Sequence, residues 1–466
     1  MNITQPMYNA INQKIRIQHI KVNLLNFIFQ TVESLEGYTL SGSISEDATS
    51  DLRRSCQVTL AVTNSSFDIA SGGKIFLDRY IQIFIGIEET RTGEIIWFNK
   101  GIYLINDPSY KYEAESNTLS FDGLDLMSKL TGVRNGYLIG TTYKIPKGSN
   151  IREAMIAVLQ DAGFNKYLID NVEQKVPYEM AFGQGSTRYD ILAGLRDILP
   201  NYQIFFDEDG VFHYTAIPSG ANENVIIDDS TWDNVFISEQ INPDFESVKN
   251  VIEVYGKTHS VEHYSTTTTV SSNIVSLTIS SLSSLAEYIM IGFTPTVPVS
   301  GNIYLAVNSF GNKKLVDSKG NFITSLDANT YYVASYQSDD TWLFLGHLQA
   351  YATISDTNPE SPFYIGNPAG EIRIALFGED YDNIQSDEQA AERCKFELYT
   401  RCRLNDTVTI TCVPIYYLST YQLASYTTKN NRATNQYMIQ SINFDLSPDS
   451  TQTVVMSKYY PYYPIL

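Results

Sequence analysis

Two histidines and a glutamate near the middle of the chain have the spacing of a zinc-protease motif. His259, Glu262 and His263 match the pattern H-x-x-E-H, in which two imidazoles bind one zinc ion and the carboxylate activates water. That chemistry requires a helix, but the flanking runs 251–256 and 266–270 are rich in Val and Thr and predict strands. In an extended chain the two histidines would lie roughly 13 Å apart. We therefore expect two histidines of a strand or loop and no metal site.

Three consecutive acids, Asp207, Glu208 and Asp209, could supply the paired carboxylates of a glycosidase. Such an enzyme places two carboxylates across a cleft, one of them in a pocket that raises its pKa. Here the acids precede a glycine between two short apolar runs, which is typical of a hairpin turn. We expect these side chains to lie at an exposed hairpin tip, in contact with water.

Two other segments have weak ligand-binding potential. The run 379–383 (Glu-Asp-Tyr-Asp-Asn) offers oxygen ligands for calcium but lacks the EF-hand spacing. Gly183 and Gly185 precede an expected helix, where an anion nest is one interpretation and an ordinary helix entrance is the simpler one. The chain contains no G-x-S-x-G, phosphate-loop or G-x-G-x-x-G motif, and its five histidines do not form a catalytic constellation. We expect no catalytic, cofactor or metal site, and no enzyme.

Short strands dominate the elements that would position these residues. Residues 14–125 contain several short runs that alternate apolar and polar side chains, with a glycine-containing hairpin loop at 89–94. This pattern predicts a small barrel or sandwich. Residues 126–236 mix short strands with two helices, one over 150–162 and one beginning near Ser186.

The last part of the chain predicts one domain interrupted by another. A strand at 248–256 precedes a Ser/Thr-rich stretch, and a compact set of short strands then fills 258–385. A capped helix follows from Ser386, and further strands complete the chain. We therefore expect 237–257 and 386–466 to form one β domain, with 258–385 inserted in a surface loop.

Composition excludes several classes of protein. The chain has 466 residues, of which 43% are hydrophobic, so two to four folded domains are expected. Lys and Arg number 32 against 52 Asp and Glu, a net charge of -20, and no basic stripe is present for specific binding of nucleic acid. No apolar run reaches the roughly 18 residues of a membrane span, and the N-terminus lacks a secretory signal. The four cysteines (Cys56, Cys394, Cys402, Cys412) are expected to be free thiols.

Several segments resemble tail-tip hub proteins of phages and prophages from Gram-positive hosts. The resemblance spans roughly 14–256 and 386–460 and is carried by these segments: 38–48 (YTLSGSISEDA), 51–60 (DLRRSCQVTL), 248–256 (VKNVIEVYG), 390–394 (AAERC), 413–418 (VPIYYL) and 437–442 (YMIQSI). Residues 301–347 separately resemble a small β unit of phage fibre and baseplate proteins, through segments such as 314–316 (KLV) and 341–345 (TWLFL).

The resemblance implies a mainly β fold with α+β subdomains. It would contain two β-barrel hub domains, at 1–125 and at 237–257 with 386–466, a mixed α/β domain at 126–236 and the inserted β module at 258–385. The implied protein is a trimeric virion structural protein at the tail tip, made in the bacterial host cytoplasm. It would link the tail tube to the host-facing tip and form part of the DNA exit channel.

The same resemblance implies partners. These are the distal tail, tail tube and tape measure proteins, with a fibre or a host-surface glycan as a further partner of the insert. Many relatives carry a C-terminal peptidase or lysin domain; because this chain ends at Leu466 after its last strand, we do not expect that activity. Acidic residues along the bore would keep DNA from sticking to it.

An alternative function is host-surface glycan binding through the 258–385 insert. Tyr331, Tyr332, Tyr336 and Trp342 would then supply stacking faces. The same aromatic residues could instead fill a small β core, which is the interpretation we favour. The Tyr/Pro-rich segment 459–466 is expected to dock on a barrel or a neighbouring subunit.

Overall fold

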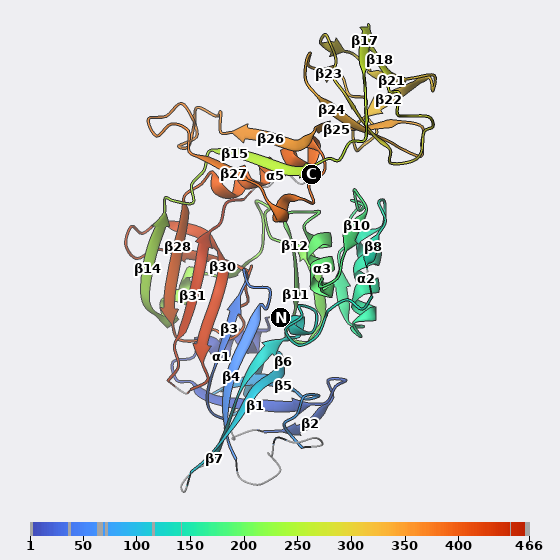
Figure 1. Cartoon of the computed structure of the whole chain (residues 1–466). Helices are drawn as coiled ribbons and strands as arrows, with labels where there is room; N and C mark the ends of the chain where they lie inside the picture. The colour runs from blue at the N-terminus through green and yellow to red at the C-terminus, as the bar shows by residue number, and fades with distance from the viewer. Residues whose placement is uncertain are drawn as a thin grey trace. The chain divides into compact units, whose positions relative to one another are not determined.

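The protein divides into two compact units. The computed structural model describes residues 3–35, 39–62, 69, 73–113, 117–140, 142–447 and 449–461. Unit 1 comprises Met1–Asp244 with Asn405–Leu466, and unit 2 comprises Phe245–Leu404 (Figure 1). Strands predominate in both units, which confirms the mainly β fold class.

A 13-stranded sheet forms the centre of unit 1. Its strands follow the order β14-β28-β31-β30-β3-β4-β7-β6-β5-β1-β2, and β29 pairs with both β30 and β13. The strands of this sheet are β1 (Ile17–Leu25), β2 (Thr31–Ser34), β3 (Thr39–Asp47), β4 (Arg54–Ala61), β5 (Tyr80–Glu88), β6 (Ile95–Tyr112), β7 (Asn117–Asp125), β13 (Val225–Ile227), β14 (Phe236–Asp244), β28 (Asn405–Cys412), β29 (Leu423–Thr427), β30 (Thr434–Asp445) and β31 (Gln452–Lys458).

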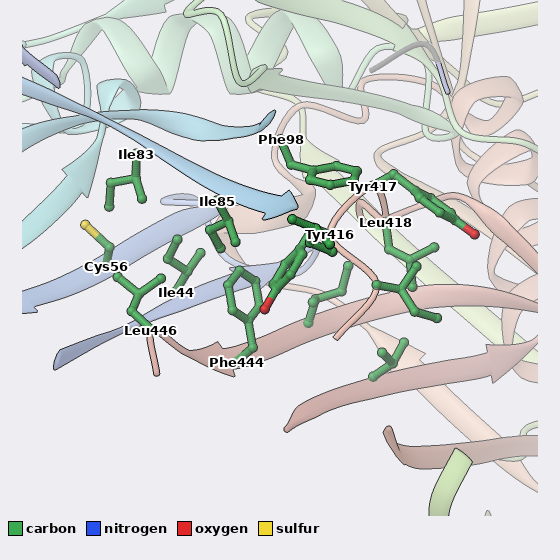
Figure 2. Close-up of a cluster of buried hydrophobic side chains, with 14 of the residues drawn as sticks. Ile44, Cys56, Ile83, Ile85, Phe98, Tyr416, Tyr417, Leu418, Phe444 and Leu446 are labelled. Carbon is green, nitrogen blue, oxygen red and sulfur yellow. The ribbon is translucent and has the colours of Figure 1, made fainter. Parts of the chain in front are cut away.

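Antiparallel pairing of β3 with β30 joins the early and late strands of this sheet. Ser43 lies opposite Asp445 and Asp47 opposite Ser441. The strands of residues 17–125 and those of residues 236–244 and 405–458 are therefore hydrogen-bonded into one sheet, and they share one apolar core. Figure 2 shows part of this core, where side chains of the early strands meet those of the C-terminal segment (Ile44, Cys56, Ile83, Ile85, Phe98, Tyr416, Tyr417, Leu418, Phe444 and Leu446).

Two short helices also pack in this core, and the sequence pattern did not predict either of them. Helix α1 (Gln5–Asn12) buries Ala10 and Ile11. Helix α4 (Asp229–Val235) is capped by Asp228 and buries Trp232, whose ring lies edge-on to Tyr426. Each fully buried large side chain of this kind contributes about 1.5–3 kcal/mol to folding.

Residues 126–216 of unit 1 form a smaller mixed α/β segment, whose apolar core also includes Leu25, Tyr80, Ile102 and Leu104 of the large sheet. It contains a three-stranded sheet in the order β11-β12-β9, a β8–β10 pair and two helices that contact each other (Figure 1). Its elements are η2 (Leu126–Lys129), β8 (Tyr143–Ile145), α2 (Ile151–Asp161), β9 (Tyr167–Ile169), β10 (Met180–Phe182), α3 (Arg188–Arg196), β11 (Tyr202–Phe206) and β12 (Phe212–Ala216). Asn150 caps α2 as expected, and α3, which we expected to begin near Ser186, has a capping box of Thr187 and Asp190.

The base of unit 2 is a three-stranded sheet covered by one helix. Strand β15 (Val251–Thr258) lies between β26 (Gln349–Ser355) and β27 (Arg373–Leu376), and helix η3 (Glu379–Tyr381) precedes α5 (Asp387–Arg401). Ile252 and Val254 of β15 pack against Ala390 and Cys394 of α5.

This pairing differs from the one we expected for 237–257 and 386–466. Both hydrogen-bonding edges of β15 are occupied by β26 and β27, so this strand does not join the large sheet. Helix α5 uses its apolar face to cover the same small sheet, whereas β14 and the strands after residue 404 do belong to the large sheet. The division of the chain into four domains stays a prediction.

The rest of unit 2 is a β module between β15 and β26. Eight strands follow the order β16-β19-β24-β25-β22-β21-β18-β17, and β20 pairs with β23. These strands are β16 (His263–Tyr264), β17 (Thr267–Ser271), β18 (Ile274–Thr278), β19 (Met290–Phe293), β20 (Val299–Ser300), β21 (Tyr304–Val307), β22 (Asn312–Val316), β23 (Ser325–Leu326), β24 (Tyr332–Tyr336) and β25 (Trp342–His347).

All four cysteines of the chain are free thiols, as expected.

Candidate functional site

Four charged side chains are buried together in unit 1. Glu46 lies on β3, Arg54 begins β4, Lys100 lies on β6, and Glu208 lies in the turn between β11 and β12. Each is at most 7% exposed. Such burial is rare for these residue types unless the charges are paired, so this network is the strongest candidate for a site with a role beyond general packing.

Arg54 connects the two carboxylates of the network. Its Nε lies 3.3 Å from Glu46 Oε2, and its Nη2 lies 3.4 Å from Glu208 Oε1. The third nitrogen, Nη1, donates to the carbonyl oxygen of Phe206 at 2.7 Å. One guanidinium therefore ties the large sheet to the β11–β12 hairpin of the mixed segment.

The loop between β28 and β29 completes the network. Ser419 Oγ donates to Glu208 Oε1 at 3.0 Å, and Lys100 Nζ donates to the carbonyl oxygen of Tyr416, also at 3.0 Å. Thr420 donates to Glu46 Oε1 through its backbone N–H at 2.9 Å and its hydroxyl at 2.8 Å. The early strands, the mixed segment and the C-terminal segment thus meet at four balanced charges.

The charges in this network stabilise one another against the cost of burial. Burial alone would raise the pKa of Glu208, but nearby positive charges, that of Arg54 above all, outweigh it and lower that pKa to about 2. Burial likewise opposes ionisation of Glu46, and Arg54 and Lys100 again bring its pKa below the ordinary value. Arg54 itself has a raised pKa, because the two carboxylates outweigh its burial. Both carboxylates are therefore ionised at neutral pH.

A second arginine extends this connection on the side of the mixed segment. Arg53 donates from Nη2 to Gln203 Oε1 at 2.8 Å, and its guanidinium lies 4.2 Å from the centre of the Phe205 ring and 5.2 Å from that of Tyr421. Asp125, at the end of β7, accepts from the backbone N–H of Met127 at 2.8 Å. Burial raises the pKa of Asp125 to about 6.

The position of Glu208 corrects our expectation for the three acids. The tip of the β11–β12 hairpin does not project into water, because Arg54, Ser419 and the side-chain amide of Asn99 all bind Glu208. Only Asp209 of the three is exposed. The carboxylates still do not face each other across a cleft, so nothing in their placement indicates glycosidase chemistry.

Strand alternation contains a signal for this network that we did not use. Ile44 and Glu46 are two residues apart and share a face of β3, and Arg54 shares a face of β4 with the buried Cys56. Lys100 has the same relation to Phe98 on β6. A charge at a core-facing position of each of three strands could have predicted a buried ion cluster; the pairing with Glu208 could not have been predicted, because it is not local.

The other candidate residues lie apart from this network. His259 is buried in a non-helical segment, and His263 begins β16, where its Nδ1 lies 2.9 Å from Ser281 Oγ. The run 379–383 contains the short helix η3, and Gly185 precedes the capped start of α3. Among the described residues, no group of three or more His, Cys, Asp or Glu side chains could hold a metal ion. The described helices are all too short or too polar to cross a membrane.

The aromatic residues of the module mainly fill its core. Trp342 and Tyr332 are buried with Phe293, and Tyr336 packs against Trp342 with ring centres 5.3 Å apart. Tyr331 lies so close to Gly292 that a side chain at position 292 would collide with the Tyr331 ring. These positions agree with a packed β core and leave no flat stacking platform on Trp342 or Tyr332.

Comparisons with known proteins place this fold among phage tail proteins. The structure of the 43 kDa tail protein of prophage MuSo2 from Shewanella oneidensis is similar, with a TM-score of 0.53 and 10% sequence identity over 95% of this chain and 98% of that one. A tail protein from Neisseria meningitidis MC58 is similar with a TM-score of 0.50 and 10% identity, over 95% and 96% of the two chains. The chain therefore has the fold of these tail proteins, which agrees with the fold that the sequence resemblance implied.

Sequence comparisons add one match. Residues 360–463 match a protein family described as a domain of unknown function (DUF5048). This segment begins in the loop before β27 and includes α5 and the strands β28 to β31. No curated protein sequence is significantly similar to the chain.

Proposed function

We propose that the protein is a structural hub subunit of a phage or prophage tail tip. It would assemble as a homotrimer under the tail tube, bind the distal tail, tail tube and tape measure proteins, and surround part of the DNA exit channel. The observation that carries this proposal is the similarity in fold to two tail proteins over nearly the whole length of each chain.

The buried charge network supports a mechanical role of this kind. A hub transmits force between the tube and the host-facing tip, so its segments should not separate under load. Arg54 and Glu46 hold the β11–β12 hairpin of the mixed segment and the loop between β28 and β29 against strands β3 and β4 through several hydrogen bonds at once. Breaking a buried ion pair by removing one partner costs about 3–5 kcal/mol, so this junction resists opening.

One end of the large sheet supports assembly with further copies. Strand β2 ends the sheet order, and among the described residues only β1 pairs with it. Phe27, Ile28 and Val32 on this β1–β2 hairpin are 69%, 54% and 54% exposed. An apolar edge of this kind tends to be covered by a partner. In the proposed trimer, the neighbouring subunit covers it.

A charge at this edge tests the proposed trimer. We expect V32K to convert the trimer to monomer in light scattering at micromolar concentration, because lysine at an edge strand opposes pairing with another chain. The matched control is L168K, since Leu168 is also exposed on a strand but lies in the mixed segment. Trimer formation by V32K, or only monomer in the unmodified protein, would contradict this part of the proposal.

Deletion of the module separates the structural role from host recognition. The appropriate deletion is 260–347, joined by a short Gly/Ser linker, because β26 and β27 belong to the base sheet. The hub proposal expects assembled tails with this deletion. Loss of adsorption by intact tails would instead assign glycan or fibre binding to the module. We also expect no released muropeptides when the purified protein is mixed with bacterial walls, because the proposed role is structural.

A further inference from the structure

Two connecting segments that lie side by side join the β module to the base of unit 2. We call the segment that leaves the base the outgoing crossing and the segment that comes back the return crossing. The chain leaves β15 at Thr258 and returns to β26 at Gln349. The backbone N–H of His259 on the outgoing crossing donates to the carbonyl oxygen of Leu348 on the return crossing at 2.9 Å. Gln349 Nε2 donates to the carbonyl oxygen of Gly256 at 3.1 Å. Two adjacent crossings form a narrow connection about which a module can rotate.

The first turn of α5 holds this connection in place. Asp387 Oδ2 accepts from the backbone N–H of His347 at 3.0 Å and lies 2.7 Å from Nδ1 of the same residue. Asp387 Oδ1 accepts from the backbone N–H of Tyr351 at 2.9 Å. Because Ser386 already caps α5, the Asp387 carboxylate is available to bind the connection. Asp387 therefore binds the last residue of β25 in the module and Tyr351 of β26 in the base at once.

Two further contacts belong to the same attachment. Glu388 Oε2 accepts from the backbone N–H of Ser318, in the turn after β22 of the module, at 3.2 Å. Gly346 has a φ of +94°, and a side chain at this position would collide with the Asp387 carboxylate. The close approach of Asp387 to the return crossing therefore requires glycine.

His259 is the buried group at this connection. Its side chain is 6% exposed, and its Nε2 has no hydrogen-bond partner among the described residues. Burial lowers the pKa of His259; a hydrogen bond with the Gln385 backbone and the charge of Asp387 oppose this shift, and Lys257 adds to it. His259 is therefore neutral at neutral pH. Because its folded pKa lies below the ordinary 6.5, the closed connection loses stability as the pH falls through this range.

The side chain of His347, which contacts Asp387, is about half exposed, so solvent screens the contact between them. A proton on the buried His259, beside Lys257, is screened much less. The direction of the response is thus set by His259.

We propose that the 259–348 module is a hinged appendage, latched to its base by Asp387 and Glu388 and released when His259 takes up a proton from solution. The module keeps its own fold in both states, because its core lies between its own strands. Release frees only the crossings and the contacts of the first turn of α5.

Hydrogen–deuterium exchange of the full chain tests the latch at neutral pH. We expect D387A to accelerate exchange of the amides of His259, His347 and Tyr351 by about 10-fold or more, since loss of one charge-assisted hydrogen bond is worth at least that. Strands β18, β21 and β24 inside the module should stay as protected as in the unmodified protein. The control is D382N, an exposed acid just before α5. Unchanged exchange at the crossings would overturn the latch, and so would melting of the whole module, because Asp387 would then belong to the module's folding core.

The role of the proton is tested by comparing pH 7.5 with pH 5.5. After correction for the intrinsic pH dependence of exchange, the crossings of the unmodified protein should open several-fold more at the lower pH. H259Q, which remains neutral at both values, should remove that difference. Persistence of the full pH response in H259Q would overturn the assignment to His259.

Discussion

The variant E208Q tests whether the buried charge network holds unit 1 together. A pKa lowered from the ordinary 4.5 to about 2 corresponds to about 3 kcal/mol of stabilisation by the ionised carboxylate. Glutamine keeps the size of the side chain and one acceptor oxygen for Ser419, but it leaves part of the charge of Arg54 and Lys100 unbalanced. We therefore expect E208Q to reduce the stability of unit 1 by about 3 kcal/mol at pH 7.

Native-state hydrogen exchange read by mass spectrometry is the assay for E208Q, because its peptides report the two units separately. The slowest amides of β5 and β30 in unit 1 should exchange about 100-fold faster, while those of β18 and β21 in unit 2 should not change. The control is D209N, since Asp209 is the exposed neighbour in the same turn and its Oδ1 accepts from the Asn99 side-chain amide at 2.7 Å, a bond that asparagine can keep. A surface substitution of this kind should alter stability by less than about 1 kcal/mol.

The pH dependence of E208Q gives a second check. Because the folded pKa of Glu208 is depressed, its contribution is present above pH 4.5 and is lost as the pH falls towards 2. The difference between E208Q and the unmodified protein should therefore shrink over that range. Equal stability of the two proteins at pH 7, or a difference that stays constant down to pH 2, would refute this account of the network.

Two further predictions concern single buried groups. The folded pKa of Asp125 is raised to about 6, so the stability contributed by its protonated form is present below pH 3.8 and lost as the pH rises through 6. In urea unfolding between pH 4 and 6.5, the free energy of unfolding of the unmodified protein should therefore fall by up to about 3 kcal/mol, and D125N, which keeps a cap for Met127, should flatten this change. An unchanged pH profile in D125N would contradict this prediction. Asn250 donates from its side-chain amide to the carbonyl oxygens of Phe363 and Gly370 at 2.8 and 2.9 Å. The variant N250A should therefore release the loop before β27 and speed limited proteolysis of this loop at least several-fold. Equal cleavage rates in N250A and the unmodified protein would show that other contacts hold the loop.

Local pattern was sufficient to predict most strands and the longer helices. Alternation of apolar and polar residues predicted most strands of the large sheet, though not β2, β13 or β29, and the capping residues Asn150 and Ser386 marked the starts of α2 and α5. Helix α1 was missed because it has only eight residues; Met7, Ala10 and Ile11 have helical spacing, but so short a run is a weak signal in a sequence rich in strands. Helices of that length depend on tertiary packing for their stability.

Pairing between distant strands was beyond what the sequence could predict. Strand β15 has the alternation of a strand in the large sheet, but its partners are β26 and β27, and no local feature distinguishes these possibilities. The pairing of β3 with β30, which joins the early and late strands of the large sheet, also leaves no local signal in the sequence. Of the segment 459–466, which we expected to dock, residues 462–466 lie outside the described residues. Tyr459 packs with Leu423 and Met438, and its hydroxyl donates to the carbonyl oxygen of Gly220 at 2.7 Å.

The same limit applies to the candidate site. The acids 207–209 were correctly placed in a hairpin turn, but the burial of Glu208 depends on Arg54, which is more than 150 residues away in the chain. The aromatic residues of the module were easier to assign, because Tyr332 and Trp342 begin two short, largely apolar strands, where large side chains usually fill a core. Local chemistry thus identified the residues, and only the fold brought them together.

The most direct test of the hub proposal is a reconstruction of the virion that encodes this chain, at a resolution that identifies its subunits. The proposal predicts three copies in a closed ring directly under the tail tube, with their sheets around an axial channel. Density for this chain only in a side fibre or in the capsid, or no density for it in the particle, would contradict the proposal.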